Sequence, residues 1–378
     1  MAAAATAALL STVAPAASAR PSSDGPGHGP WHARLLGAQV VDKGLVVDGT
    51  RVGELSSIDY DRATGAYYLV ADDTESAPAR FYTARMRVGV TGIHDVRFVR
   101  ATWLRRSDGT LFPPLSSSGT ELADPESLRL DPTSRTLYWG SEGKRVVPEQ
   151  GKPQLVDPWV RQASLSGTYL RELRLPRDER MSAEPTGPRD NLVFEGLTLS
   201  TDHRWVVASD EGALYQDGPI ATVKHGATNR ITWWNKRRGR AVKQLAYPLS
   251  RIPKAPRPST ASADNGISAL LAVDRHHYLV VERSYASGVG NTIRVFEIDT
   301  RGATNVLHRE SLSDGHYRPV SKRLVVDLGT IGLDHLDNIE GVTWGPRLPT
   351  GERTLVFVSD DNFNDSQVTQ LVAVAVRP

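Results

Sequence analysis

Acidic residues recur at a regular interval in this sequence, each at the head of an apolar segment. Glu126, Glu195 and Glu340 open three such segments, and Ser56 and Asn265 stand at the same place in two others. By subtraction, the steps between the five positions are 70, 69, 70 and 75 residues. Spacing this regular is typical of repeat proteins in which each unit packs against its neighbours. Carboxylates repeated in this way could hold a metal ion or act as acids and bases.

A second set of acids ends the strand-like segment that follows each of these positions. Its members are Asp72, Glu142, Asp210 with Glu211 beside it, Glu282 and Asp360. Neighbouring antiparallel strands begin and end at the same edge of a sheet, so both sets of acids should lie on one face. Four arginines are expected on that face as well, because they start the next strand or directly follow an acid. They are Arg80, Arg161, Arg230 and Arg283.

The segments that carry these residues read as β-strands. In the third repeat, residues 194–200, 205–211, 230–234 and 241–247 form four short runs of apolar or alternating character. Four antiparallel strands per repeat, more polar toward the outside, describe the blade of a β-propeller. We therefore predict an all-β fold, a β-propeller of five four-stranded blades. Six blades are the alternative, because the long loop at residues 252–264 has room for further strands.

The two ends of the chain are expected to share one blade. After Glu340 only three strands remain, the last at residues 367–376, and residues 33–41 read as a further strand. The 38 residues after Glu340 and the 36 residues from Arg20 to Leu55 together amount to about one repeat. Pairing of the N- and C-terminal strands would close the ring and cover exposed sheet edges.

The first residues have the character of an export signal. Residues 1–19 are Ala-rich and end in Ala17-Ser18-Ala19, a small-x-small cleavage motif, although no Lys or Arg precedes Arg20. We predict a signal peptide at 1–19, a disordered leader rich in Pro, Gly and Ser at 20–30, and a single propeller domain at 31–378. No other apolar run approaches the ~20 residues that span a bilayer. A secreted monomer without a membrane span is expected.

Composition excludes several kinds of chemistry. The 378 residues include no Cys, so disulfides, thiolate metal sites and Cys nucleophiles are absent. A formal net charge of only +2 gives no support to a nucleic-acid partner. The sequence contains neither the Gly-x-Ser-x-Gly motif of serine hydrolases nor the His-Glu-x-x-His motif of zinc peptidases.

Acids and arginines gathered at one narrow channel mouth predict a metal site. So many carboxylates cannot all ionise unpaired in a confined space. A divalent cation with a preference for oxygen, above all calcium, would compensate them. The expected metal ligands are Asp72, Glu126, Glu142, Glu195, Glu211, Glu282, Glu340 and Asp360. Taken singly, each of these acids is better explained as a turn cap; it is their recurrence at equivalent places that favours a site.

Roles in catalysis and substrate binding follow from the same placement. The expected catalytic residues are Glu195, Glu340 and Asp210. Arginine suits the recognition of an oxyanion, above all phosphate, through paired hydrogen bonds. The expected substrate-binding residues are Arg80, Arg161, Arg230, Arg283 and His335, the last lying just ahead of Glu340.

Two motifs resemble those of a known family. They are Glu195-Gly196-Leu197-Thr198 with Ser209-Asp210-Glu211-Gly212, and residues 338–345 with Ser359-Asp360-Asp361-Asn362-Phe363. Both are similar to the esterase-like, phytase-like secreted β-propeller family of bacteria, over nearly the whole chain after the leader. This resemblance implies a propeller hydrolase. The Glu-Gly pair at the head of an inner strand is also similar to calcium-dependent lactonase propellers.

Three functions remain open on this evidence. The preferred one is metal-assisted hydrolysis of a small anionic phosphoester at the acidic channel mouth. The second is a calcium-dependent lactonase or carboxyl esterase that uses the same acids. The third is a non-catalytic extracellular propeller whose outer loops bind a partner.

Overall fold

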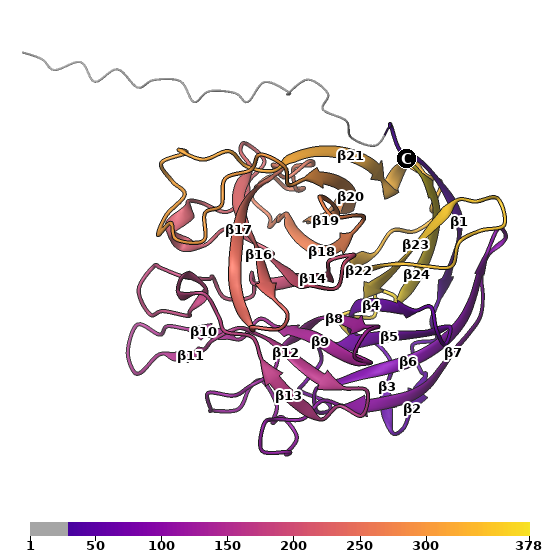
Figure 1. Ribbon diagram of the computed structural model, residues 1–378, viewed down its shortest axis with the longest axis horizontal. Helices are drawn as coiled ribbons and strands as arrows, with labels where there is room; N and C mark the ends of the chain where they lie inside the picture. Colours follow the sequence, from indigo (N-terminus) through magenta and orange to yellow (C-terminus); the bar gives the residue numbers. More distant parts are fainter. Residues whose placement is uncertain (1–28) are drawn as a thin grey trace, which may run out of the picture.

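The computed structural model describes residues 29–378. The predicted signal peptide at 1–19 and residues 20–28 of the predicted leader lie outside this range. Within it, the chain forms five four-stranded antiparallel sheets arranged around a central axis (Figure 1). From the axis outward the blades are β4 (Leu55–Asp61), β5 (Ala66–Ala71), β6 (Arg80–Gly89) and β7 (Gly92–Trp103); β8 (Pro125–Asp131), β9 (Thr136–Ser141), β12 (Trp159–Ser164) and β13 (Tyr169–Glu172); β14 (Phe194–Leu199), β15 (Trp205–Asp210), β16 (Ala227–Asn235) and β17 (Arg240–Leu249); β18 (Gly266–Ala272), β19 (His277–Ala286), β20 (Gly290–Asp299) and β21 (Ser321–Asp327); and β22 (Asn338–Trp344), β23 (Arg353–Asp360), β24 (Gln370–Arg377) and β1 (His32–Val40).

The fifth blade joins the two ends of the described chain. Strand β1 pairs antiparallel with β24, from His32 opposite Arg377 to Val40 opposite Gln370. Figure 1 shows the indigo N-terminal strand beside the yellow C-terminal strands. The predicted closure is therefore confirmed. The alternative of six blades is wrong, because the loop at residues 252–264 contains no strand.

Smaller elements decorate this frame. Two short hairpins and three 3₁₀-helices lie in the loops: β2 (Val46–Val47) with β3 (Thr50–Arg51), β10 (Lys144–Val146) with β11 (Gln154–Val156), η1 (Arg177–Glu179), η2 (Tyr215–Asp217) and η3 (Leu328–Thr330). Over residues 29–378, no helix has the length and apolar character needed to cross a membrane.

Apolar side chains fill the space between neighbouring blades. Leu279 and Val281 of β19 belong to one buried cluster with Leu355 and Phe357 of β23, which joins the fourth blade to the fifth. Because the inner strands have blades on both sides, most of their residues are buried, and every residue of β8, β14 and β18 is buried. Each fully buried Leu, Val or Phe side chain contributes roughly 1.5–3 kcal/mol. The blades are thus held together by burial on both faces of each sheet.

A β-bulge interrupts the innermost strand of every blade at its beginning. The extra residues in the inner strands are Ser56, Glu126, Glu195, Ser268 and Glu340. Four of them are the positions from which the repeat was recognised. The fourth repeat is a correction: the equivalent residue is Ser268, and not Asn265. The side chain of Asn265 donates instead to the carbonyl of Ser250 at 2.8 Å, ahead of the strand.

The residue after each bulge is small, because neighbouring blades approach closely there. A Cβ atom at Gly196 would lie 2.2 Å from Ser209 Oγ and 3.0 Å from Leu270 Cβ of the next blade. At Gly341 it would lie 2.9 Å from the backbone nitrogen of Ile58. The Glu-Gly pair therefore combines two requirements: the bulge turns the Glu side chain aside, and the Gly lets the next blade pack.

Candidate functional site

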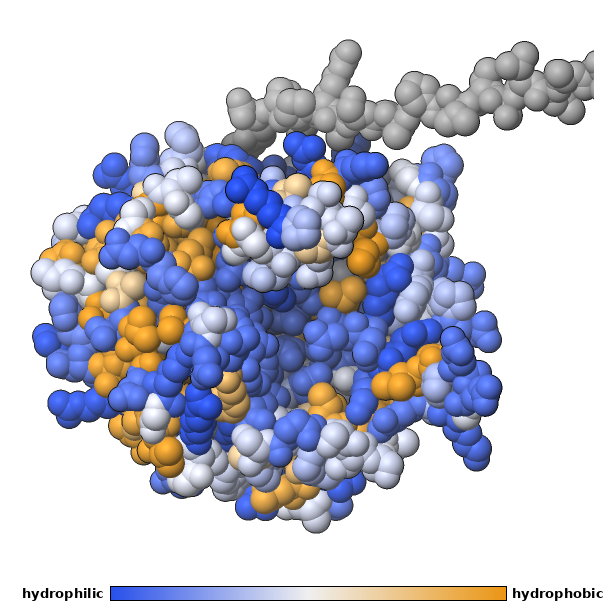
Figure 2. Space-filling model, turned by 180° about the vertical axis from the view of Figure 1, so that it is seen from behind, coloured by the Kyte–Doolittle hydropathy of each residue, from blue (hydrophilic) through white to orange (hydrophobic). Residues whose placement is uncertain are grey.

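A cavity of about 1020 Å³ opens at one end of the channel. In the view from behind Figure 1, the molecule has a central hollow with a hydrophilic wall (Figure 2). The inner strands contribute their first residues to this wall, and the loops before and after them form the rim. The rim includes the apolar side chains of Leu115, Tyr285, Leu336 and Phe363.

Two rings of equivalent residues surround the channel at this end. The first ring consists of the five bulge residues. In the neighbouring strand of each blade, one residue pairs with the residue just before the bulge, and the next residue along the chain belongs to the second ring. The second ring is Asp72, Glu142, Glu211, Arg283 and Asp360. Together the rings contain seven carboxylates and one guanidinium, because the fourth blade supplies Ser268 and Arg283 where the other blades supply mainly acids.

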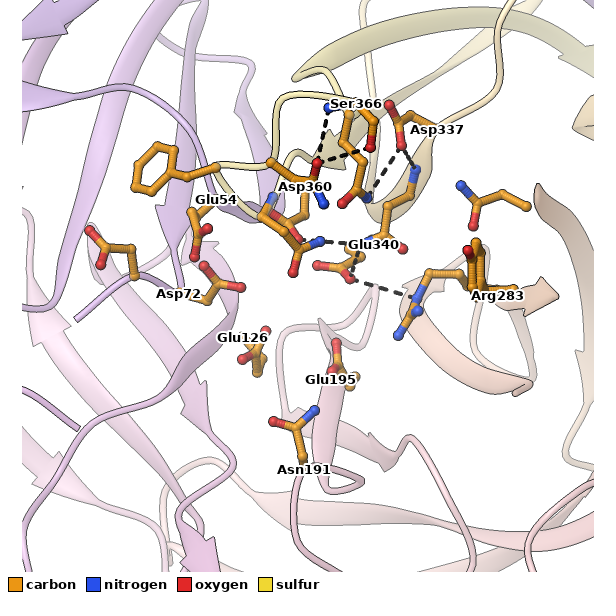
Figure 3. Close-up of a pocket in the computed structure, with 18 of the residues that line it drawn as sticks. Glu54, Asp72, Glu126, Asn191, Glu195, Arg283, Asp337, Glu340, Asp360 and Ser366 are labelled. Atoms are coloured by element: carbon orange, nitrogen blue, oxygen red, sulfur yellow. Dashed lines mark hydrogen bonds and ion pairs between the residues drawn. The ribbon is translucent and has the colours of Figure 1, made fainter. Parts of the chain in front are cut away.

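The carboxylates stand close enough to share bound cations. Four overlapping triads have oxygen atoms within 4.8 Å of one another: Glu54 with Asp72 and Asp360, Asp72 with Glu126 and Glu340, Asp124 with Glu126 and Glu142, and Glu142 with Glu195 and Glu211. Figure 3 shows Glu54, Asp72, Glu126, Glu195, Glu340 and Asp360 around one space.

Glu54 and Asp124 were not predicted from the sequence. Each stands two residues before a bulge residue, Ser56 and Glu126, so the same repeat spacing contained the signal. Glu54 also has a φ of 50°, and its backbone N–H donates to Asp361 Oδ1 at 2.9 Å. A non-glycine residue in this region is strained and persists where its surroundings hold it, often at functional sites.

Burial and mutual repulsion disfavour the charged form of these acids. Burial, followed by the neighbouring carboxylates, raises the pKa of Asp72, Glu126, Glu142, Glu195 and Asp360 well above the usual range. The same causes raise the pKa of Asp124 to about 7. Burial raises the pKa of Glu211 to about 7, although Arg283 opposes the shift. Without a bound cation, part of this cluster is therefore protonated near neutral pH.

The residues fit a hard divalent cation such as calcium. Asp72 Oδ1, Glu142 Oε2 and Glu195 Oε2 are buried and have no hydrogen-bond donor among residues 29–378. Buried oxygens left in this way are costly unless something satisfies them. Calcium binds six to eight oxygen ligands, many of them from Asp and Glu. Overlapping triads of carboxylates supply that chemistry.

Arg283 is the single Arg or Lys side chain that lines the cavity, as far as residues 29–378 are concerned. Its Nη2 lies 2.8 Å from Glu211 Oε1, and its Nε lies 3.6 Å from Glu340 Oε1. It thus faces the acids from the blade that contributes no acid to either ring, as Figure 3 shows.

The channel is closed below the acids by one arginine. Arg129 of β8 donates hydrogen bonds to the carbonyls of Ile58, Leu128, Leu197, Leu270 and Val342, at 2.5 to 3.3 Å. These carbonyls stand two residues after the bulge in each of the five blades. The side chain is buried, and its Nη1 lies 4.0 Å from Asp59 Oδ1. Sequence reasoning missed Arg129, because it stands alone inside an apolar strand.

The comparison with protein families settles what kind of propeller this is. The family Phytase-like, described as "Esterase-like activity of phytase", matches residues 50–363. The chain belongs to the phytase-like family. The match includes both rings of the cavity and the motifs at Glu195 and Asp360. A search of curated protein sequences finds no match.

Solved structures with a similar fold are distant from this phytase-like chain. The periplasmic gluconolactonase PpgL of Pseudomonas aeruginosa is 13% identical, with a TM-score of 0.36 and 87% of each chain covered. The GH43 β-1,3-galactosidase BT3683 is 10% identical, with a TM-score of 0.44, 89% of this chain and 95% of that chain covered. The Dos1 propeller is 7% identical, with a TM-score of 0.33 and coverages of 86% and 69%. Similarity at this level carries no argument about function.

Three of the four predicted anion-binding arginines lie away from the cavity. Each lies in a third strand, Arg80 at its start and Arg161 and Arg230 a few residues in, but each side chain is held by acids of nearby loops or strands. Arg80 Nη2 lies 3.0 Å from Asp73 Oδ2, and Arg230 Nε lies 2.6 Å from Asp217 Oδ2. Arg161 lies 2.7 Å from Glu121 and 2.9 Å from Glu172, in a second cavity of about 610 Å³ beside the second blade.

Two of the predicted acids also point elsewhere. Asp210 and Glu282 occupy the position just before the second ring, and side chains alternate along a strand. Asp210 lies beside Glu179 of η1 and does not line the cavity. Glu282 accepts hydrogen bonds from Tyr247 at 2.8 Å and from Arg294 at 3.2 Å, and it forms an ion pair with Lys322. Glu211 and Arg283, which were also predicted, stand one position later: Glu211 belongs to a carboxylate triad, and Arg283 lines the cavity.

Proposed function

We propose that this protein hydrolyses a phosphoester with the help of divalent cations bound in the acidic cavity. The observation that carries the proposal is the set of four overlapping carboxylate triads, several of whose buried oxygens lack a partner. Overlapping triads have room for more than one cation, and paired metal ions are typical of enzymes that cleave phosphoesters. Membership of the phytase-like family supports a hydrolase.

The residues that would hold cations are those of the triads. Asp72, Glu126 and Glu340 form one group, and Glu142, Glu195 and Glu211 form another. When bound, a divalent cation supplies Lewis-acid polarisation of the ester group. We propose calcium, because all of these side-chain ligands are carboxylates.

Other groups of the cavity would bind the substrate and move protons. The guanidinium of Arg283 can donate two hydrogen bonds to a phosphoryl group. Glu195 or Glu340, whichever of the two does not hold a cation, would accept the proton of the attacking water. Burial is the main cause of the raised pKa of both residues. Asp210 is left out of this role, because its carboxylate lies outside the cavity.

A lactone or carboxyl ester is the second candidate substrate. The observation in its favour is that Arg283 alone, among the cavity's described lining residues, carries a fixed positive charge. An uncharged ester needs no more than one cationic group. A substrate with many phosphates would need several, because each phosphate adds negative charge to an already acidic site.

Parallel assays of calcium-dependent hydrolysis test the proposal. The substrates are p-nitrophenyl phosphate, phytate, p-nitrophenyl acetate and a simple lactone, each with calcium and with EDTA. We expect calcium-dependent phosphate release that Glu195→Gln abolishes and that Glu282→Gln, a buried acid outside the cavity, preserves. Calcium-dependent cleavage of the acetate or lactone alone would favour the second candidate. No hydrolysis of any substrate would leave a non-catalytic binding propeller.

The cellular setting belongs to the same proposal. We expect export with removal of residues 1–19 and action as a monomer outside the cell. N-terminal sequencing of protein from the culture medium should begin near Arg20, and sedimentation should give the mass of one chain. An intact Met1 on protein retained in the cytoplasm would contradict export.

A further inference from the structure

A histidine and an aspartate pair at the cavity rim, outside both acid rings. His335 lines the cavity, and its side chain is 56% exposed. Its Nε2 lies 3.0 Å from Oδ2 of Asp337, which is 3% exposed. An imidazole that shares one ring nitrogen with a carboxylate has its tautomer and orientation set by that contact. The other nitrogen, Nδ1, has no hydrogen-bond partner within residues 29–378 and is left for a ligand.

Asp337 is itself held in place on several sides. Its Oδ1 accepts a hydrogen bond from the backbone N–H of Asn338 at 2.8 Å, and its Oδ2 accepts one from the backbone N–H of Val368 at 2.7 Å. The carbonyl of His335 accepts a hydrogen bond from Gln370 Nε2 at 3.1 Å. A carboxylate fixed by two backbone donors can hold the imidazole at a constant angle to the cavity. A surface histidine that served only solubility would not need these hydrogen bonds.

The same segment reaches the acid rings. Asn338 Nδ2 donates to Glu340 Oε1 at 2.9 Å and lies 3.3 Å from Asp360 Oδ2. Residues 335–340 therefore present a histidine at the rim and a carboxylate at the ring to one cavity. Figure 3 shows Asp337 and Glu340 of this segment. Two proton-transfer groups of different kinds, facing one space from one rigid segment, can act on the two sides of a bond that breaks.

We infer that His335 is the general acid of the reaction, with Asp337 as its positioning residue; this rests on the proposed function. In the step, the oxygen of water forms a bond to phosphorus while the bond from phosphorus to the leaving oxygen breaks. The electron pair of that bond goes to the leaving oxygen, which takes the Nδ1 proton of the imidazolium. The proton of water goes to the carboxylate of Glu195 or Glu340, and exchange with solvent restores both groups.

The leaving group of the substrate separates this role from simple substrate binding. A p-nitrophenolate leaves without a proton, whereas the alkoxide of a glycerol phosphate needs one. His335→Gln should lower kcat for glycerol phosphate by about 10²- to 10⁴-fold, the usual contribution of a general acid. For p-nitrophenyl phosphate the loss should be no more than a few-fold. Asp337→Asn should show the same selectivity with a smaller loss.

The matched control is His316→Gln. His316 is 83% exposed and lies beside Asp314, at 3.5 Å, but it does not line the cavity. It should leave both rates unchanged. Equal losses on the two substrates in His335→Gln, or a rise in KM alone, would overturn the general-acid role while the proposed function stands. If the wild-type protein hydrolyses neither phosphate with calcium, the proposed function fails and the role of His335 fails with it.

Discussion

Two layers of one channel, two residues apart on the inner strands, differ in how they satisfy buried polar groups. In the lower layer, five carbonyl oxygens from five blades meet the guanidinium of Arg129, and each accepts a hydrogen bond. In the upper layer, the single guanidinium of Arg283 pairs with Glu211 and Glu340 of the seven carboxylates, and several carboxylate oxygens have no hydrogen-bond partner among residues 29–378. The lower layer is complete within the chain. The carboxylate oxygens of the upper layer would be satisfied only by a further bound group, such as a cation.

We infer from this difference that the lower layer stabilises the fold and that the upper layer is the place where a ligand binds. A polar group that is buried and satisfied within the chain contributes to folding, whereas one left unsatisfied costs free energy until a ligand arrives. The acids are therefore expected to destabilise the metal-free protein, and Arg129 to stabilise it. Four measurements, of decreasing expected effect, test this contrast between the satisfied lower layer and the unsatisfied upper layer.

Removing the guanidinium of the lower layer should have the largest effect. Arg129→Met leaves five carbonyls without their donor, and loss of one partner of a buried charged group typically costs about 3–5 kcal/mol. Urea unfolding measures the change. Arg275→Met, which removes an exposed arginine in a turn, is the control and should change stability by less than about 0.5 kcal/mol. Similar small changes in both variants would show that water replaces Arg129 at little cost.

The pH dependence of stability should expose the upper layer next. Acids whose pKa is higher in the folded than in the unfolded state bind more protons when folded, so stability falls as pH rises between the two values. For Glu211 the folded pKa is about 7. That shift corresponds to about 3 kcal/mol at ~1.4 kcal/mol per unit. Metal-free protein should therefore lose stability from about pH 4.5 to pH 7.5. Stability that rises over this range would contradict the unsatisfied state of these acids.

Calcium should reverse that loss. A ligand that binds the folded state alone stabilises it by roughly 2.7 kcal/mol at a hundredfold excess over Kd. Glu195→Gln keeps the size of the side chain but removes its charge, so the calcium-dependent rise in Tm should shrink or disappear. Magnesium at the same concentration serves as the comparison, because it demands a tighter octahedral site. A wild-type Tm that calcium does not change would remove the metal from the proposal.

Glu282→Gln should have the smallest effect and no link to calcium. This acid resembles Glu195 in burial, but Tyr247, Arg294 and Lys322 already satisfy it. Gln retains some of these hydrogen bonds and loses the charge, for a cost of about 1–2 kcal/mol. Its calcium-dependent shift in Tm should equal that of the wild type. A diminished shift would mean that Glu282 reaches the cation after all.

Much of the fold could be read from the sequence, because repetition and strand character are local properties. The interval near 70 residues predicted the five blades, and the shortage of strands after Glu340 predicted that the N-terminal strand closes the ring. Side-chain direction was harder to predict. The sequence predicts that Asp210 and Glu282 face the channel together with Glu211 and Arg283, but only Glu211 and Arg283 do so, since the phase of alternation depends on a bulge in the neighbouring strand. No sequence pattern marks such a bulge.

The remaining misses have separate causes. Arg80, Arg161 and Arg230 lie in the expected strands, but acids outside those strands, such as Asp217 and Glu121, decide where they point. Glu54 and Asp124 could have been predicted, because each stands two residues before one of the repeat positions. Arg129 has no counterpart in the other blades, where Asp59, Thr198, Leu271 and Thr343 take its place. A residue unique to one repeat leaves no periodic signal.

Because Arg129 fills the channel below the acids, the opening at the rim would serve both the cation and the substrate of the proposed function. Whatever binds among the acids must come and go through the same opening as the substrate. A cation would therefore have to load first, and a bound ester would trap it until the products departed. Such a compulsory order predicts that a chelator acts quickly on the resting protein and slowly on one saturated with substrate. In the proposed hydrolase, the order of binding and release at this opening would then set the order of the kinetic steps.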